Sequence, residues 1–196
     1  MLIFVRHGRS TGNAADLLVG QADVPLDDHG LAQIDTLAHA VGHVDRVVCS
    51  PLQRCRVTAA VLGLPVEIDD RIIEVDYGSY DLTRLGDVPA DVWNQWRTDL
   101  DFVPPNGESM RAMGTRVREF CDEISAAAIT LNIAVVCHVS PIKAAVAWAL
   151  GVGDATAWRL YVDQASITRI AVTTRGVALH SFNETNHLAS LDRGQP

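Results

Sequence analysis

The 196-residue chain has the length of one ordinary domain, and its 48% content of hydrophobic residues is enough for a substantial core. Its net charge of −8 and its pI of about 5.2 exclude a nucleic-acid binder that works through general electrostatics. They do not exclude a small basic pocket, because a few arginines can gather at one place.

The cysteines indicate a reduced, cytoplasmic protein. Cys49, Cys55, Cys121 and Cys137 form no CxxC pair, and two of them end apolar runs, where buried free thiols are usual. The N-terminus places its apolar residues before its charges, so we expect no signal peptide. No apolar stretch approaches the ~20 residues that a membrane span needs, so we expect no membrane contact.

The first predicted element is a buried strand over residues 2–5, followed at once by Arg6, His7 and Gly8. Apolar residues at helical spacing predict a helix over residues 30–41, which Gly42 ends. Residues 46–49 are predicted to form the second strand. Charged groups at the end of a buried strand, beside a glycine that lets the backbone turn, are a common site geometry in α/β proteins.

Ser50 and Pro51 carry the signal of a helix start, with Ser50 as N-cap and Gln53 completing a capping box. This places Arg54 in the first helical turn, where the backbone N–H groups have no partners. A third short strand is predicted over residues 65–68. The βαβαβ pattern predicts a mainly parallel sheet with helices on both faces.

Residues 69–108 differ in character. Between positions 76 and 108 there are seven acidic and two basic residues, several large aromatic residues, and prolines that interrupt regular structure. We expect an irregular segment with a short helix near 89–97, lying over the sheet edge as a lid.

A long amphipathic helix is predicted from Met110 to Ala127, and a strand over residues 133–137 that leads directly into His138. Ser140 and Pro141 repeat the cap signal and predict a helix to residue 150. Later strands are predicted at 159–162, 166–172 and 177–181. The polar tail from residue 186 is expected to fray.

Two places in this pattern share one arrangement, in which a strand leads into polar residues and a helix start. Ligands of α/β sheets bind outside the carboxyl ends of the strands, and helix N-termini favour phosphate. Arg6 and Arg54 can each form two bonds to phosphate oxygens, and His7 and His138 would face the same volume. Two histidines could instead bind a metal, but neighbouring arginines make a cation site costly.

A phosphoryl group between arginines can be attacked by a neutral imidazole to give a phosphohistidine, which water then hydrolyses. The departing alkoxide needs a proton. From the residues alone, Glu74 or Asp76 is the natural donor, provided that burial raises its pKa.

Several blocks of the chain resemble the histidine phosphatase superfamily, in its phosphoglycerate-mutase-like branch. Arg6-His7-Gly8 with Asn13 resembles its signature, and residues 20–26 with Gly30 and Gln33 resemble the segment that follows. Residues 50–54 with Thr58 and Ala59 are similar to the block with the family's second arginine, and Glu74 with residues 77–80 to the block with its proton donor. Residues 106–109 resemble the start of its long helix, and His138 matches its second histidine. The matches run in order from residue 2 to about 150.

The resemblance implies a role for each matched residue. His7 would be the nucleophile, and Arg6, Arg54 and His138 would hold the phosphoryl oxygens. Asn13 and the N–H of Val139 would add contacts to the phosphate, and Glu74 would act as the acid and later as the base. The resemblance implies no metal and no cofactor.

The chain departs from the family at three places. Arg9 stands where Glu or Gln is more frequent, which makes it a candidate substrate contact. Asp81-Leu82 replaces a Glu-Gly pair, and Val139 replaces a frequent Gly. These departures leave substrate preference in question but remove no group that the chemistry needs.

We therefore predict a single domain over residues 1–196, with a lid-like insert at 76–108. Its fold would be a three-layer α/β/α sandwich with a mostly parallel sheet, as in phosphoglycerate mutases. The predicted function is a metal-independent phosphomonoesterase that acts on a small phosphorylated metabolite, such as a phosphosugar. The alternatives are a phosphomutase, a phosphoprotein phosphatase and a non-catalytic regulatory relative. The sequence leaves a homodimer open.

Overall fold

The computed structural model describes residues 1–192, which contain a six-stranded sheet in the order β3-β2-β4-β1-β5-β6. The strands are β1 (Leu2–Arg6), β2 (Arg46–Cys49), β3 (Val66–Ile68), β4 (Ile133–Cys137), β5 (Ile167–Thr173) and β6 (Gly176–Glu184). The pairs β1–β4, β4–β2 and β2–β3 are parallel, whereas β5 and β6 add antiparallel at one edge. The predicted α/β fold with a mostly parallel sheet is confirmed.

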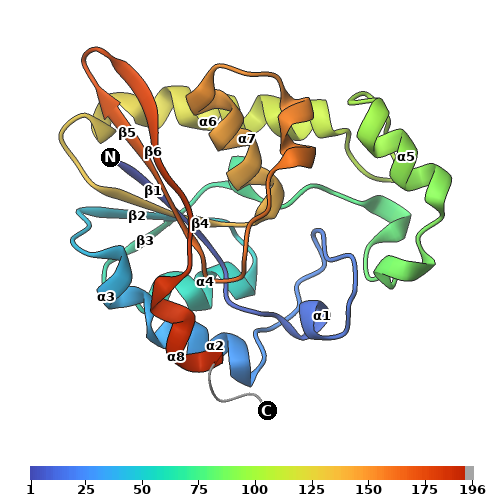
Figure 1. Cartoon of the computed structure of the whole chain (residues 1–196), viewed down its shortest axis with the longest axis horizontal. Helices are drawn as coiled ribbons and strands as arrows, with labels where there is room; N and C mark the ends of the chain where they lie inside the picture. Colours follow the sequence, from blue (N-terminus) through green and yellow to red (C-terminus); the bar gives the residue numbers. More distant parts are fainter. Residues whose placement is uncertain (193–196) are drawn as a thin grey trace.

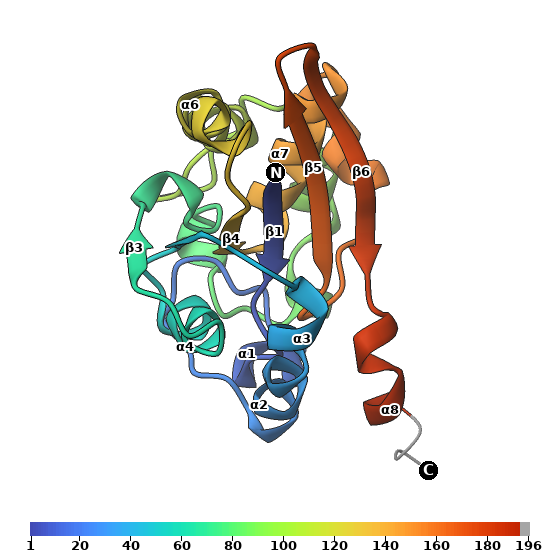
Figure 2. The same ribbon diagram turned by 90° about the vertical axis from the view of Figure 1, so that its left-hand side faces the viewer.

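Helices cover both faces of the sheet (Figures 1 and 2). The α-helices are α1 (Thr11–Ala14), α2 (Asp28–Asp35), α3 (Leu37–Val41), α4 (Gln53–Ala60), α5 (Ala90–Thr98), α6 (Met110–Ala128), α7 (Val139–Leu150) and α8 (Ala189–Asp192). Short 3-10 helices are η1 (Asp70–Ile72), η2 (Gly78–Tyr80), η3 (Leu85–Asp87), η4 (Asp154–Arg159) and η5 (Asn186–Leu188). Across residues 1–192, no helix combines the length and apolar composition needed to cross a bilayer.

The alternation of β1 explains the layers, because successive side chains of a strand point to opposite faces. Leu2 and Phe4 belong to the core formed with α6 and α7, whereas Ile3 and Val5 belong to the core formed with α2, α3 and α4. All four are buried. The first strand is therefore apolar on both sides, and its first polar residues fall where the strand ends.

Two predicted elements differ from the structure. The helix expected over residues 30–41 is divided into α2 and α3 at Thr36, whose hydroxyl donates to the Gln33 carbonyl at 2.8 Å and competes with the helical bonds. The strand expected over 159–162 does not form, because the Val162 carbonyl accepts a bond from the Arg6 side chain instead of from a strand. Residues 186–192 form η5 and α8, and the rest of the predicted frayed tail lies outside the described residues.

Both predicted Ser-Pro caps are wrong. The helix α4 begins at Gln53 with Leu52 as its N-cap, and α7 begins at Val139 with His138 as its N-cap. The reason at the first site is a competing partner, since the Ser50 hydroxyl lies 2.7 Å from the buried His138 Nε2. A fully buried imidazole needs a hydrogen-bond partner, and the Ser50 hydroxyl supplies it.

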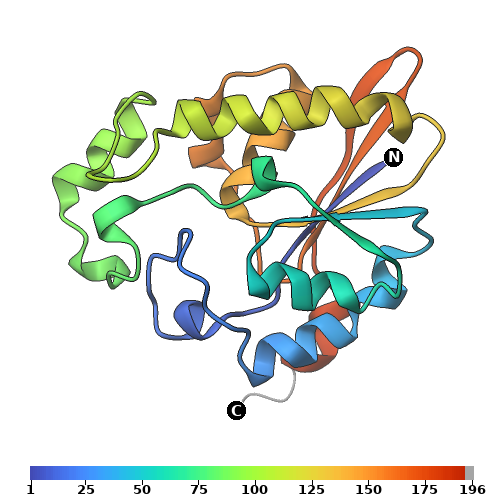
Figure 3. The same cartoon turned by 180° about the vertical axis from the view of Figure 1, so that it is seen from behind.

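The segment 76–108 holds the predicted short helix, as α5, at one end of the molecule (Figures 1 and 3). It packs around Trp96, whose ring meets those of Tyr77, Tyr80, Trp93 and Phe102 edge to face at 5.3 to 5.9 Å. Rather than covering a sheet edge, the segment is joined to the loop after α1: Leu18 N–H donates to the Thr83 carbonyl and Leu85 N–H to the Asp16 carbonyl.

Candidate active site

The parallel pairing of β1 with β4 brings the two predicted histidines together. Arg6 is aligned with Cys137, so His7 and His138 are each the next residue beyond neighbouring strands. Their ring centroids lie 5.1 Å apart at an angle of 64°. The His7 N–H still donates to the Cys137 carbonyl at 3.1 Å, which fixes the backbone at the point where the site begins.

The glycine after His7 is required by close packing. A Cβ at Gly8 would lie 2.6 Å from the Gly30 carbonyl oxygen and 2.9 Å from Ile34 Cγ2. The Gly8 carbonyl in turn lies 2.7 Å from His7 Nδ1. Because a carbonyl can only accept, Nδ1 carries the proton in the neutral ring, and Nε2 keeps its lone pair.

That lone pair accepts a hydrogen bond from Arg54 Nε at 3.3 Å. Burial lowers the pKa of His7 well below its ordinary value of 6.5, and the charges of Arg54 and Arg6 act in the same direction. Burial, Arg54 and His7 similarly lower the pKa of His138. Both rings are therefore neutral near pH 7, and Nε2 of His7 is available as a nucleophile.

Arg54 is fully buried in the first turn of α4 and is held by main-chain carbonyls. Its Nη1 donates to Ala22 O at 2.8 Å and its Nη2 to Gly20 O at 2.6 Å. None of the ion pairs among residues 1–192 includes Arg54. Neutral acceptors hold the guanidinium, so its charge remains available to an anion.

Arg6 brings a second guanidinium to the site. Its Nη1 donates to Val162 O at 2.7 Å, but its Nε is buried and has no hydrogen-bond partner among the described residues. Buried donors are nearly always satisfied in native proteins, so an unsatisfied one needs an explanation. Arg6 lines a cavity of about 180 Å³ that His7, Asn13, Glu74 and Val139 also line.

Glu74 is buried in this cavity with only 5% of its surface exposed. Its carboxylate accepts from the N–H of Val75 at 2.8 Å and from that of Ser140, near the start of α7, at 3.2 Å. The backbone that carries it is fixed by Arg116 of α6, which donates to the carbonyls of Arg71, Ile73 and Glu74. Sequence reasoning missed Arg116, since nothing in an amphipathic helix pattern separates it from a surface arginine.

The remaining predicted residues take different positions. Asn13 uses its side-chain oxygen to accept from Ser10, and its amide nitrogen makes no hydrogen bond within the described residues. Val139 is the first residue of α7, where the N–H has no helical partner. His138 is fully buried behind His7 and, like Arg54, does not line the cavity.

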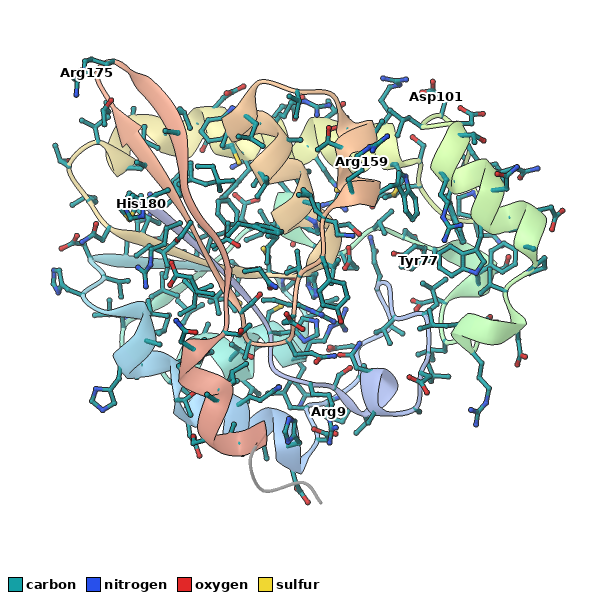
Figure 4. The ribbon with its side chains drawn as sticks, in the orientation of Figure 1. Arg9, Tyr77, Asp101, Arg159, Arg175 and His180 are labelled. Atoms are coloured by element: carbon teal, nitrogen blue, oxygen red, sulfur yellow. The ribbon has the colours of Figure 1, made fainter. Side chains whose placement is uncertain are left out.

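The structure places Arg9 away from the cavity. Its Nε donates to Asp27 Oδ2 at 2.7 Å, and its backbone N–H donates to the Gln33 side chain. Figure 4 shows Arg9 low in the molecule near α2, well separated from Tyr77. Arg9 as a substrate contact therefore stays a prediction that this geometry does not favour.

The cavity has an apolar wall that sequence reasoning missed. Its further lining residues are Leu17, Leu18, Val19, Tyr77 and Leu85. The first three follow closely after α1, which carries Asn13, and this proximity was the available signal. Leu85 comes from a segment whose position depends on the whole fold. A larger groove of about 650 Å³ lies beside β3 and α4, but none of the predicted site residues lines it. We therefore assign the site to the smaller cavity.

Residues 1–192 contain no cluster of three or more His, Cys, Asp and Glu side chains that could hold a metal ion. The groups that converge on the cavity are cationic or neutral donors, together with one carboxylate and one nucleophilic nitrogen. This arrangement can hold a tetrahedral oxyanion, attack it at its centre and protonate a departing oxygen.

The two neutral histidines give the stability a defined pH dependence. In the unfolded chain they titrate near 6.5, whereas the folded protein keeps them unprotonated well below that value. As the pH falls from 7.5 to 5.5, the unfolded state therefore binds protons that the folded state excludes. We expect the free energy of unfolding to decrease below pH 6.5 by up to about 1.4 kcal/mol per pH unit for each histidine.

Urea unfolding at several pH values measures this slope, and His7→Gln should reduce it. A free energy of unfolding that is constant between pH 7.5 and 5.5 would contradict the assignment of two buried neutral imidazoles.

Comparison with known proteins agrees with this geometry. The family model of the histidine phosphatase superfamily (branch 1) matches residues 2–185. The adenosylcobalamin/alpha-ribazole phosphatase of Salmonella typhimurium is 31% identical, over 93% of this chain and 95% of the relative. Phosphoserine phosphatase 1 of Hydrogenobacter thermophilus is 31% identical, over 95% of this chain and 93% of the relative.

Other relatives are longer. The chain is 30% identical to the bifunctional protein Rv2228c of Mycobacterium tuberculosis over 95% of its own length but spans only 54% of that protein. Among solved structures, the alpha-ribazole phosphatase from Shigella flexneri superposes with a TM-score of 0.83 at 27% identity, covering 93% of this chain and 96% of the other. The mycobacterial glucosyl-3-phosphoglycerate phosphatase Rv2419c in complex with VO3 gives 0.83 at 25% identity, covering 94% and 99%.

Proposed function

The chain belongs to the histidine phosphatase superfamily, and from this premise we propose that it is a metal-independent phosphomonoesterase that forms a phosphohistidine on His7. The observation that carries the proposal is the unpartnered Nε–H of Arg6, buried beside a cavity that the nucleophilic ring also lines. Arg6 lines the cavity, so its guanidinium would donate to a phosphoryl oxygen there, and the buried guanidinium of Arg54 next to His7 would add a second charge.

In the first step the phosphoryl group enters the cavity, where Arg6, the Asn13 amide and the Val139 N–H donate to its oxygens. Arg54 Nε transfers its hydrogen bond from His7 to a phosphoryl oxygen, which frees the lone pair of Nε2. Nε2 then forms a bond to phosphorus while the bond from phosphorus to the leaving oxygen breaks. The Nδ1–H bond to Gly8 O stabilises the positive charge that develops on the ring.

Glu74 protonates the leaving oxygen in this step. In the second step its carboxylate accepts a proton from water, whose oxygen attacks phosphorus and breaks the bond to Nε2. The products are the free alcohol, inorganic phosphate and the original histidine. The Ser140 N–H, at 3.2 Å from Glu74, keeps the carboxyl group in place through both transfers.

The substrate that we propose is a small metabolite that is anionic only at its phosphate, such as a phosphosugar. Arg6 is the single permanent cation among the lining residues, and the other wall consists of leucines, Val19 and Tyr77. A carboxylate or second phosphate on the leaving group would lose its hydration there without gaining a partner. Trp96 is only 1% exposed and cannot contact a sugar, so Tyr77 is the aromatic residue at the cavity.

The test is hydrolysis of a substrate panel by the purified chain in the presence of EDTA. We expect turnover of p-nitrophenyl phosphate and higher kcat/KM for glucose and ribose phosphates than for phosphoserine, 3-phosphoglycerate or a bisphosphate. Activity that requires added metal would contradict the mechanism. A clear preference for carboxylated or doubly phosphorylated substrates would contradict only the substrate class.

The identity of the proton donor gives a separate prediction. Glu74→Gln should lower kcat about 10²-fold for alkyl phosphates, whose leaving groups need a proton, and far less for p-nitrophenyl phosphate. Asp76→Asn is the matched control, since the Asp76 carboxylate caps the Gly78 N–H at 2.8 Å and does not line the cavity. Equal losses of Glu74→Gln on both substrates, or a leaving-group dependence in Asp76→Asn, would move the acid elsewhere.

We also propose a cytoplasmic location. The four cysteines are free and buried, and burial raises the pKa of Cys49 to about 12, so that its thiol is unreactive. A homodimer stays a prediction.

A further inference from the structure

Asp81 lies in the segment 76–108, and its carboxylate contacts the loop of residues 20–22. Oδ1 accepts from the Gly20 N–H at 2.7 Å, and Oδ2 accepts from the Ala22 N–H at 2.7 Å. Each carboxylate oxygen therefore holds one residue of the loop, on either side of Gln21. Charge-assisted bonds of this length are the stronger class of protein hydrogen bonds.

Arg54 binds the opposite side of the same two residues. The Gly20 and Ala22 carbonyls accept from Nη2 and Nη1 of Arg54, at 2.6 and 2.8 Å. Both residues thus have their N–H group on the carboxylate and their C=O group on the guanidinium. The loop lies between the two charges and connects them through its peptide groups.

The loop has other contacts as well: the Val24 N–H donates to the Ala22 carbonyl at 3.1 Å, and Gly20 packs closely against the Val75 carbonyl. Residues 20–22 belong to no helix or strand, and Arg54 makes no ion pair among the described residues. The direction of the two carbonyls sets the plane of the guanidinium and, with it, the direction of Nε toward His7 Nε2. The side chain of Gln21 also donates to the Glu74 carbonyl at 3.1 Å, so the same loop contacts the backbone of the proposed acid.

We propose that Asp81 is a positioning residue for catalysis, which holds the two carbonyls that orient Arg54 toward the phosphoryl group and His7. This inference rests on the proposed function. It gives a role to a position at which the chain departs from its family's usual glutamate.

A purely structural role, in which Asp81 only attaches the segment 76–108 to the body, explains less. That attachment is already made by backbone bonds: Leu18 N–H to Thr83 O at 2.8 Å, Leu82 N–H to Leu18 O at 2.8 Å and Leu85 N–H to Asp16 O at 2.8 Å. None of these bonds involves residues 20–22. The carboxylate is therefore needed for the loop that holds Arg54 rather than for docking.

The experiment is a double-mutant cycle with p-nitrophenyl phosphate, in which Asp81→Asn and Asp81→Ala are combined with Arg54→Ala. We expect kcat/KM to fall about 10-fold in Asp81→Asn and about 10²-fold in Asp81→Ala, because small displacements of a catalytic group are costly. With Arg54 already absent, Asp81→Asn should lower kcat/KM less than about 2-fold, since coupled residues are not additive. Asp99→Asn is the matched control, because it removes one carboxylate from the same segment, where Asp99 only caps the Asp101 N–H.

Vanadate affinity, measured by calorimetry, depends on the orientation of the Arg54 guanidinium and requires no turnover. In the Asp81 variants it should weaken in parallel with kcat/KM. If Asp81→Ala does not fold, the nearly isosteric Asp81→Asn carries the cycle. Wild-type kcat/KM and vanadate affinity in Asp81→Asn, or an undiminished loss in the Arg54→Ala background, would overturn the proposal. A wild-type chain that binds vanadate but hydrolyses no phosphomonoester would instead contradict the proposed function. In that case the vanadate affinity of Asp81→Asn, compared with that of the wild type, would decide the role of Asp81.

Discussion

His7→Ala should lower kcat for p-nitrophenyl phosphate by about 10³-fold or more, equivalent to about 4 kcal/mol of transition-state stabilisation. The alanine removes the nitrogen that bonds to phosphorus, and no other imidazole can replace it. The Nε2 of His138 lies 2.7 Å from the Ser50 hydroxyl, which occupies its lone pair or its proton.

The matched control is His180→Ala, since His180 is an exposed histidine of β6, on the far side of the molecule from Tyr77 in Figure 4. Rapid quenching of the wild type with substrate should trap an acid-labile phosphoenzyme, which His7→Ala should lack. A variant that keeps more than about a tenth of the wild-type kcat, or still forms a phosphoenzyme, would exclude His7 as the nucleophile.

The second large effect is expected at Arg54. Arg54→Ala should lower kcat/KM about 10²- to 10³-fold, because a fixed buried cation stabilises the charge of the transition state most when water is excluded. Arg54→Lys should recover part of the activity, since an ammonium group restores the charge but not the fork of donors that the guanidinium presents.

Arg56→Ala provides the control, because Arg56 is an exposed arginine of the same helix. Arg54→Ala also leaves the buried Gly20 carbonyl without its donor, whereas the Ala22 carbonyl keeps the Val24 N–H, so a loss of stability of about 1–3 kcal/mol is expected as well. Thermal melting separates that loss from catalysis. Equal kcat/KM values for Arg54→Ala and Arg56→Ala would remove Arg54 from the proposed mechanism.

The sequence predicted those parts of the fold in which one physical signal dominates. The strands β2 and β4 were placed at their observed bounds, since short apolar runs with polar ends have few alternatives in a buried sheet. The long helix α6 was placed from the spacing of its apolar side chains. His7 and His138 followed because the carboxyl ends of neighbouring parallel strands meet at one edge.

Other features could not be predicted because they depend on tertiary partners. Ser50 has the sequence pattern of a helix cap, and only the presence of the buried His138 decides that its hydroxyl turns elsewhere. From the sequence alone, Trp96 cannot be distinguished from an aromatic residue that faces a ligand. Only the structure shows that four neighbouring rings enclose it. The apolar wall forms only where the segment 76–108 packs against the loop after α1. No local sequence pattern predicts that contact.

The main-chain bonds that join Leu18 to Thr83 and Asp16 to Leu85 have an evolutionary consequence. The bonds join main-chain groups, so they do not depend on the side chains at positions 17 and 85, apart from proline. Leu17 and Leu85 can therefore be exchanged for other residues without dismantling the rim from which they project. Selection, or a mutant library restricted to these two positions, could change which alcohol is preferred as the leaving group of the substrate. The residues that carry out phosphoryl transfer would remain the same.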